Sequence, residues 1–190
     1  MFFRNLFFYT LPEISAVTDE ALESALESAA LKPVGALAMQ SRGFVPPLGE
    51  SGSLLQRIES SLWLCLGGED RILPAAVVQR ECQLKIAELE QAKGHPLGKR
   101  ARAQLKQETL DTLMPRAFVK PSRVNAIINR KRGFIAIDTS SAKAAEALVS
   151  KLREALGSFP ALPLQAEQAP RSILTQFLLG QELPEHWHLG

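Results

Sequence analysis

The apolar and polar positions in the first part of the chain change period at clear boundaries. Residues 2 to 10 carry apolar side chains at odd and even positions, which predicts a strand covered on both faces. After Thr18, a favourable N-cap, leucine and alanine recur at helical spacing opposite three glutamates, so an amphipathic helix should end before Pro33. Residues 34 to 45 predict a second strand, which their glycines weaken.

Two more strands and two glycine-rich breaks follow. Residues 43 to 49, which include two prolines, predict an ordered loop, whereas residues 54 to 59 and 62 to 66 predict short strands. Gly67-Gly68 predicts a turn that closes the second of these strands. The order of strand, helix and three strands is typical of an α+β layer.

The middle of the chain predicts a helical hairpin. Pro74 suits the first position of a helix, and an apolar stripe then continues to Gly94. Residues 94 to 98 contain two glycines and a proline, which break the helix, and a second helix should run from about Lys99 to Pro115. Two helices joined by so short a connection are expected to pack antiparallel.

The last part of the chain repeats the combination of strands and helix. An extended segment at 116 to 123 precedes predicted strands at 124 to 129 and 134 to 138. A helix should begin near Ser141 and end at Gly157, and a further strand and a short apolar helix complete the pattern.

We therefore expect an α+β fold, with antiparallel sheets, packed helices and a projecting basic helical hairpin. Residues 1–73 and 117–178 should form the core as two sheet-helix halves. Residues 74–116 should form the hairpin, which is the tip of the molecule, and residues 179–190 should form a tail.

Basic residues concentrate around the predicted hairpin. Residues 80 to 132 contain thirteen Lys or Arg and five Asp or Glu, a formal charge of +8, whereas the whole chain carries +2 and the remainder −6. A positive segment on a mildly acidic body is typical of a polyanion-binding protein. The alternative is a hairpin whose charges serve only solubility. Lys99, Arg102 and Lys106 fall at i, i+3 and i+7, so three cations should share one helix face.

Motifs of enzymes and metal sites are weak in this sequence. Gly94 to Arg100 lacks the spacing of a phosphate-binding P-loop and has arginine where a magnesium-binding hydroxyl belongs. His186 and His188 lie in the predicted tail without a third ligand, and no nucleophile has an evident base. Cys65 and Cys82 fit reduced core thiols of a cytoplasmic protein. We expect no enzyme activity, no metal, no cofactor and no membrane span.

Phe118 lies between two cations in the predicted extended segment. Arg116, Phe118 and Lys120 have the same parity, so their side chains should project to one side. A side shared with two cations is seldom fully buried, which favours a contact surface for Phe118. A core residue and a platform on which single-stranded bases stack are the alternatives.

Five blocks of the sequence are informative when they are taken together. They are Phe3-Arg4-Asn5-Leu6 with Tyr9, Gly43 to Gly49 (GFVPPLG), Arg71 to Pro74 (RILP), Leu113 to Phe118 (LMPRAF) and Ser140 to Leu164. In this order they resemble the bacterial recombination-associated protein family RdgC, over about residues 1 to 178.

That resemblance implies a non-sequence-specific DNA-binding protein that restrains RecA-driven recombination. It implies dimers that join head to head and tail to tail into a ring, with a basic central hole sized for duplex DNA. In the family the hairpin projects as a tip, and the aromatic of the Pro-Arg-Ala-Phe motif, here Phe118, lies at the contact between two tips. Two features depart from the family: its members continue well beyond the matching part, with a Lys-Gln pair linked to DNA contact, and their hairpin is more continuously helical.

The sequence thus predicts a sequence-independent binder of double-stranded DNA that acts as a homodimer, limits RecA access or activity, and associates with the nucleoid in the cytoplasm. Ten cations are predicted to contact DNA phosphates: Lys99, Arg100, Arg102, Lys106, Arg116, Lys120, Arg123, Arg130, Lys131 and Arg132. Phe118 is predicted to form the dimer contact. The alternative is a protein-interaction module that binds a recombinase or a second copy through the hairpin, without direct DNA binding.

Overall fold

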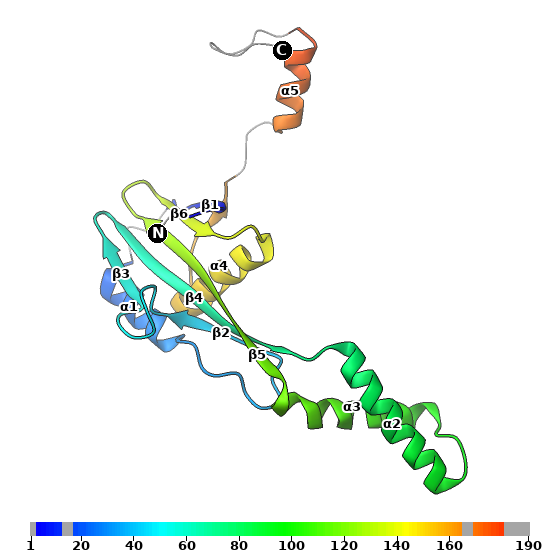
Figure 1. The fold of residues 1–190 in the computed structure, drawn as a ribbon. Coiled ribbons are helices and arrows are strands. Elements are labelled where there is room, and N and C mark those ends of the chain that lie inside the picture. Colours follow the sequence, from blue (N-terminus) through cyan, green and yellow to red (C-terminus); the bar gives the residue numbers. More distant parts are fainter. Residues whose placement is uncertain (1–2, 13–16, 165–168, 181–190) are drawn as a thin grey trace.

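The computed structural model describes residues 3–12, 17–164 and 169–180 (Figure 1). The strands are β1 (Leu6–Thr10), β2 (Gln40–Val45), β3 (Leu55–Ile58), β4 (Ser61–Ile72), β5 (Phe118–Asn129), β6 (Phe134–Asp138) and β7 (Leu162–Pro163). The helices are α1 (Asp19–Ser28), α2 (Ala75–Lys93), α3 (Lys99–Leu113), α4 (Ala142–Leu156) and α5 (Pro170–Leu178), and a short 3₁₀ helix, η2 (Met114–Arg116), follows α3.

The described strands form one sheet in the order β2-β4-β5-β6-β1-β7, and β3 pairs with the first part of β4. Neighbouring strands are antiparallel. The predicted α+β class is confirmed, although the strands from both parts of the chain join one sheet of seven strands instead of separate sheets.

The core lies between one face of this sheet and the helices α1 and α4. Leu64 of β4, Ile128 of β5 and Ile137 of β6 are fully buried on that face. Tyr9 of β1 lies on the same face, where its hydroxyl donates to Glu146 Oε1 of α4 at 2.8 Å. Alternate residues of each strand therefore point away from these helices, to the second face of the sheet.

The helix boundaries near the core follow the predicted caps. Thr18 Oγ1 accepts a hydrogen bond from the Ala21 N–H at 3.2 Å at the start of α1. Ser141 caps α4 in the same way, and Gly157 ends that helix with a φ of 73°. The short apolar helix expected near the end of the chain is α5. Residues 165–168, within the last predicted strand, and 181–190, most of the predicted tail, lie outside the described residues.

Strand β4 is longer than predicted, because Gly67 and Gly68 continue the strand instead of turning the chain. A Cβ on Gly67 would lie 2.6 Å from Val45 Cγ1, and a Cβ on Gly68 would lie 2.7 Å from Arg42 Nη1. The predicted turn is wrong because these glycines accommodate the side chains of the neighbouring strand β2.

The loop predicted at residues 43 to 49 begins as strand. Gly43 to Val45 belong to β2, and the Phe44 N–H donates to the Ala29 carbonyl at 3.0 Å. A Cβ on Gly43 would lie 2.4 Å from Leu31 Cα, so the chain that leaves α1 passes β2 at a distance that requires glycine.

The α2-α3 hairpin projects from the narrow end of the sheet (Figure 1). The extended segment predicted at 116 to 123 and the strand predicted at 124 to 129 join in one strand, β5. This strand pairs with β4 along its whole length. β6 pairs only as far as Asn125, so residues 118 to 124 of β5 have no second neighbouring strand within the described part of the chain. Pro74 is the N-cap of α2, one residue before its predicted position.

Candidate nucleic-acid interface

The ten predicted contact cations lie in three separate places. The hairpin carries Lys99, Arg100, Arg102 and Lys106, the narrow end of the sheet carries Arg116, Lys120 and Arg123, and the β5-β6 turn carries Arg130, Lys131 and Arg132. Because a strand rises about 3.3 Å per residue, β5 separates the turn from Phe118 by roughly 35 Å. The structure therefore brings the cations of the hairpin and the narrow end towards one end of the molecule and leaves the turn at the other (Figure 1).

All four of the predicted hairpin cations are exposed, but only three of them lack a partner among the described residues. Lys99 and Arg100 lie in the first turn of α3, and Lys106 lies two turns further along. None of these three side chains has an ion pair or hydrogen bond within residues 3–12, 17–164 and 169–180. They are free to approach a phosphate.

Arg102, by contrast, stabilises the hairpin itself. Its Nη2 lies 2.8 Å from Glu90 Oε1, and its Nε donates to the Leu97 carbonyl at 3.0 Å. The Leu97 N–H donates to the same Glu90 oxygen at 2.7 Å, and this bond, followed by the one from Arg102, holds the pKa of Glu90 below its usual range. Arg102 thus closes the connection between α2 and α3.

Lys99, Arg102 and Lys106 occupy neighbouring positions on α3, as their spacing predicts, but that side of the helix does not consist of free cations alone. Arg102 lies on the side of α3 that also carries the buried Leu105 and Thr109, because residues three and four apart share a helix face. Lys99 and Lys106 flank that side, so they are exposed while Arg102 contacts Glu90.

At the narrow end of the sheet, Arg116 and Lys120 are exposed and Arg123 is engaged. Arg123 Nη2 donates to the Pro46 carbonyl and Nη1 to the Gly49 carbonyl at 3.5 Å, which holds the β2-β3 loop over the second face of the sheet. Cys65 lies buried beneath this contact; burial raises the pKa of its thiol, and the Arg123 guanidinium partly opposes that shift.

Phe118 is 84% exposed. It pairs across the ribbon with Ile72, which is also exposed, so two apolar side chains adjoin at the base of the hairpin. The expectation that Phe118 lies outside the core agrees with this exposure, and its role in a dimer contact stays a prediction.

The turn contains one engaged and two exposed cations. Arg130 Nη1 lies 2.6 Å from Asp19 Oδ1 at the start of α1, and partial burial lowers the pKa of the Arg130 guanidinium. Arg57 also contacts Asp19. The side chains of Lys131 and Arg132 point to solvent and have no partner in the described part of the chain.

An apolar groove of about 580 Å³ runs along the hairpin near its base. Its lining includes Leu73, Val78, Cys82, Ile86 and Leu110. Lys106 lines the same groove, so an exposed cation adjoins an apolar surface. The groove is large enough to hold an aromatic side chain.

Sequence reasoning missed two cations that lie outside the positive segment. Arg42 and Lys143 line a hollow of about 490 Å³ where β2, β4 and β5 meet the start of α4. Arg42 pairs with Asp70 at 2.6 Å, whereas Lys143 has no partner among the residues that the structure describes. A count of charge along the chain passes over them, because only the sheet brings their segments together.

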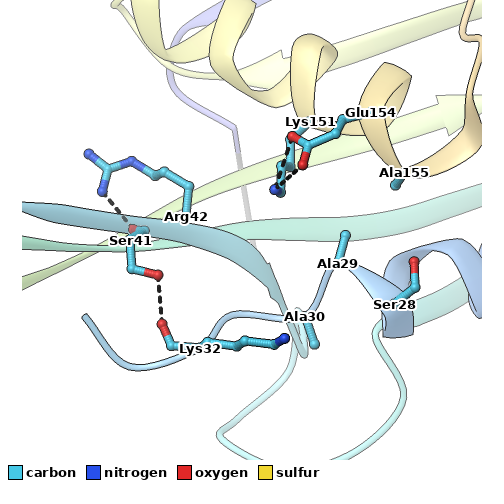
Figure 2. Close-up of a pocket in the computed structure, with 9 residues that line it drawn as sticks. All are labelled: Ser28, Ala29, Ala30, Lys32, Ser41, Arg42, Lys151, Glu154 and Ala155. Atoms are coloured by element: carbon cyan, nitrogen blue, oxygen red, sulfur yellow. Dashed lines mark hydrogen bonds and ion pairs between the residues drawn. The ribbon is translucent and has the colours of Figure 1, made fainter. Parts of the chain in front are cut away.

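A second pocket, of about 350 Å³, lies between the end of α1, β2 and α4 (Figure 2). Its cations are Lys32, Arg42 and Lys151, but Lys151 Nζ lies 3.0 Å from Glu154 Oε1 and Arg42 pairs with Asp70. Ser41 Oγ donates to the Lys32 carbonyl at 2.6 Å across the floor of the pocket. Two of the three positive charges are therefore already neutralised.

The described residues contain no group of three or more His, Cys, Asp or Glu side chains placed to hold a metal ion. His186 and His188 lie outside them. No helix in the described ranges is both long and apolar enough to span a bilayer.

A family model described as "Putative exonuclease, RdgC" matches residues 1–190. The chain belongs to the RdgC family. Its relatives include the recombination-associated proteins RdgC of Xylella fastidiosa strain 9a5c, 48% identical, and of Xanthomonas campestris pv. campestris strain B100, 49% identical. Each match covers 100% of this chain and 63% of the relative, so the chain spans less than two thirds of the length of these RdgC proteins. The family expected from the five sequence blocks is confirmed.

Proposed function

We propose that the chain binds double-stranded DNA without sequence preference, acts as a homodimer, and limits the access or activity of RecA at the nucleoid. The observation that carries this proposal is the set of cations on the hairpin and at its base that are exposed and have no partner among the residues that the structure describes. Lys99, Arg100, Lys106, Arg116 and Lys120 all lie there. The relatives are named for an association with recombination, which fits a DNA-binding role.

The cations are lysines and arginines without the asparagine and glutamine groupings that read adenine edges. Contacts of this kind hold phosphates and carry no base information. Affinity should therefore be similar for unrelated sequences and should fall steeply with salt.

The dimer part of the proposal rests on Phe118 and the hairpin groove. Phe118 is exposed at the base of the hairpin, and the apolar groove lined by Val78 and Ile86 lies on the same projection. In a dimer of identical subunits, the exposed ring of one subunit can insert into the apolar groove of the other. Such buried aromatic residues often contribute most of the binding energy of an interface.

The same two features favour an alternative. In that case the hairpin and Phe118 bind a recombinase or a second copy, and the surrounding cations only steer the encounter. Salt separates the two functions, because each neutralised phosphate contributes about −0.9 to the slope of log affinity against log salt.

The test is fluorescence anisotropy with two duplexes of equal length and unrelated sequence, between about 50 and about 200 mM salt. We expect equal affinities for the two duplexes and a smaller slope for the variant Lys99→Glu/Arg100→Glu. Lys32→Glu, which changes an exposed cation outside the positive segment, is the matched control. If the wild-type protein binds neither duplex at the lowest salt but slows RecA strand exchange, the protein-interaction function is established instead.

The family description also names exonuclease activity, whereas the relatives' names do not. We propose binding without cleavage. End-labelled duplex incubated with the protein and Mg²⁺ or Mn²⁺ should keep its length, and release of nucleotides that disappears with the Lys99→Glu/Arg100→Glu variant would overturn this part of the proposal.

A further inference from the structure

The hollow where β2, β4 and β5 meet the start of α4 contains a row of three residues that crosses the sheet. Arg42 of β2 and Ser122 of β5 lie opposite Gly68 of β4, one on each side. A Cβ on Gly68 would lie 2.7 Å from Arg42 Nη1 and 2.7 Å from Ser122 Oγ. Because glycine has no side chain, the guanidinium and the hydroxyl converge above the middle strand, and both line the hollow of about 490 Å³.

The hollow lies where the hydrophobic core ends. Leu66 and Val124, in the neighbouring row of the sheet, belong to the core or pack against it. Alternate residues of a strand share a face, so Arg42 projects from the same side of the sheet as the core. Leu66, Val124, Ala144 and Ala147 give the hollow an apolar wall beside its polar row.

Three polar side chains that line the hollow have no partner among the described residues. They are Gln40 of β2, Ser122 of β5 and Lys143 of α4. Arg42 and Lys143 outnumber the one carboxylate of the lining, Asp70, so the hollow carries a formal charge of +1. Separate elements therefore bring unpaired hydrogen-bonding groups and a net positive charge to one cavity.

Arg42 belongs to this hollow more than to the pocket beside it. Figure 2 shows its side chain extending away from Lys151 and Glu154, which form the far side of the neighbouring pocket. Its Nη2 lies 2.6 Å from Asp70 Oδ1, and both side chains are about one third exposed. A pair as exposed as this contributes little to stability, so the guanidinium can also bind an incoming anion.

We propose that the hollow binds a small organic phosphate of the size of a nucleoside monophosphate. Sites for small molecules combine an apolar wall with a few convergent polar groups, at volumes of roughly 300 to 1,000 Å³. A phosphate monoester has three acceptor oxygens and about two negative charges, which suits the donors of Lys143, Ser122 and Arg42. The organic part lies against the apolar wall, where the Gln40 amide can bond to its polar edge. This site is separate from the hairpin cations and does not require duplex DNA.

Isothermal titration calorimetry with deoxyadenosine monophosphate tests the site. Lys143→Glu should weaken binding about tenfold or more, because a hydrogen bond to a charged group contributes more than the free energy of a tenfold change. Glutamate is favourable in the first turn of a helix, so α4 should stay folded. Lys32→Glu, a matched charge change in the neighbouring pocket, should leave the affinity unchanged. A wild-type protein that does not bind the monophosphate, or equal affinities of wild type and Lys143→Glu, would overturn the proposal.

Two further probes test the class of ligand. Deoxyadenosine, which lacks the phosphate, should not bind, because the cations and hydroxyl then have no anion to hold. Inorganic phosphate should bind more weakly than the monophosphate, because it leaves the apolar wall uncovered. If deoxyadenosine binds as tightly as its monophosphate, the hollow is no phosphate site.

The hairpin variant Lys99→Glu/Arg100→Glu separates this site from the proposed DNA function. It should bind duplex DNA more weakly and the monophosphate as well as wild type does. In NMR spectra of the wild-type protein, the amide signals of Ser122 and Ala144 should shift as the monophosphate is added. Shifts confined to the first turn of α3 would place the ligand on the hairpin and refute the site. The same conclusion follows if Lys143→Glu weakens duplex binding but not monophosphate binding.

Discussion

The guanidinium of Arg71 donates from Nη1 to the Met114 carbonyl at 2.9 Å and thereby joins the end of β4 to the end of α3. Its Nη2 donates to the Gly35 carbonyl at 3.3 Å. One side chain therefore fastens the base of the hairpin to the loop that precedes β2. The contact thus links the base of the hairpin to the sheet.

Arg71→Ala should lower the free energy of unfolding by about 2 kcal/mol, since hydrogen bonds to charged groups each contribute roughly 1.5 to 3 kcal/mol. Amide hydrogen exchange should accelerate in α2 and α3 more than in the core strands. Arg71→Lys should recover only part of the loss, because an ammonium cannot span both carbonyl groups as the planar guanidinium does. Exchange that accelerates equally everywhere would show that Arg71 supports the whole sheet.

Phe118→Ala should leave stability within about 0.5 kcal/mol of wild type, as is usual for an exposed position. Sedimentation should show weaker self-association, or anisotropy should show weaker DNA binding. A core phenylalanine would instead cost roughly 3 to 5 kcal/mol upon truncation. A large fall in melting temperature with unaltered association would contradict an interface role.

The cations of the β5-β6 turn should separate into two classes. Lys131→Ala/Arg132→Ala should preserve stability and, if the turn contacts DNA, reduce the salt slope by about one per lost phosphate contact. Arg130→Ala should lower stability by roughly 1 to 3 kcal/mol, because Asp19 loses an ion-pair partner in a partly buried position. Thermal melting and anisotropy of both variants check this division. Equal melting temperatures would show that the Arg130-Asp19 pair is dispensable.

Acid should loosen the connection between α2 and α3. The pKa of Glu90 is lowered in the folded chain, so its stabilising effect is complete above the usual carboxyl pKa and disappears as the pH falls through the lowered value. NMR titration of the Glu90 carboxyl measures this directly. In Arg102→Ala the pKa should rise but remain lowered, because the Leu97 N–H is its principal cause. If the pKa of Glu90 returns to its usual value in Arg102→Ala, Arg102 alone causes the lowering.

Gly43→Ala should destabilise the fold by about 1 to 3 kcal/mol, because a Cβ there would overlap the backbone of Leu31. Gly98→Ala is the matched control, since nothing lies within 4 Å of a Cβ at that position. Chemical denaturation of the two variants compares a required glycine with a permissive one. Equal destabilisation by Gly43→Ala and Gly98→Ala would show that the backbone near Leu31 can move to make room for a Cβ at position 43.

Local signals predicted the helices well. Ser141 and Gly157 cap α4 through groups within a few residues of each end, and the breaks at 94 to 98 and at Pro115 need no tertiary contact to act. The length of β4 was not predictable in the same way, because Gly67 looks like a turn residue until β2 is seen to lie beside it.

The candidate site shows the same division. Lys and Arg content identified the positive segment, and parity placed Phe118 outside the core. Sequence alone could not show that Arg102 and Arg130 already have carboxylate partners, because Glu90 and Asp19 reach them only after the helices and strands have packed. Lys143 was not predicted as a candidate contact, because the β2, β4 and β5 residues that line its hollow are remote from it in sequence.

Within the described part of the chain, residues 118 to 124 of β5 form a sheet edge that could promote aggregation, and two of its own residues oppose this. Between Phe118 and Val124 the strand offers backbone groups on its free side, and such an edge invites the strands of other chains to add to it. Pro121 has no N–H to donate, and Lys120 would bring like charges together in a stack of identical strands. Both residues therefore disfavour the addition of a strand from another chain to the arm that carries the hairpin.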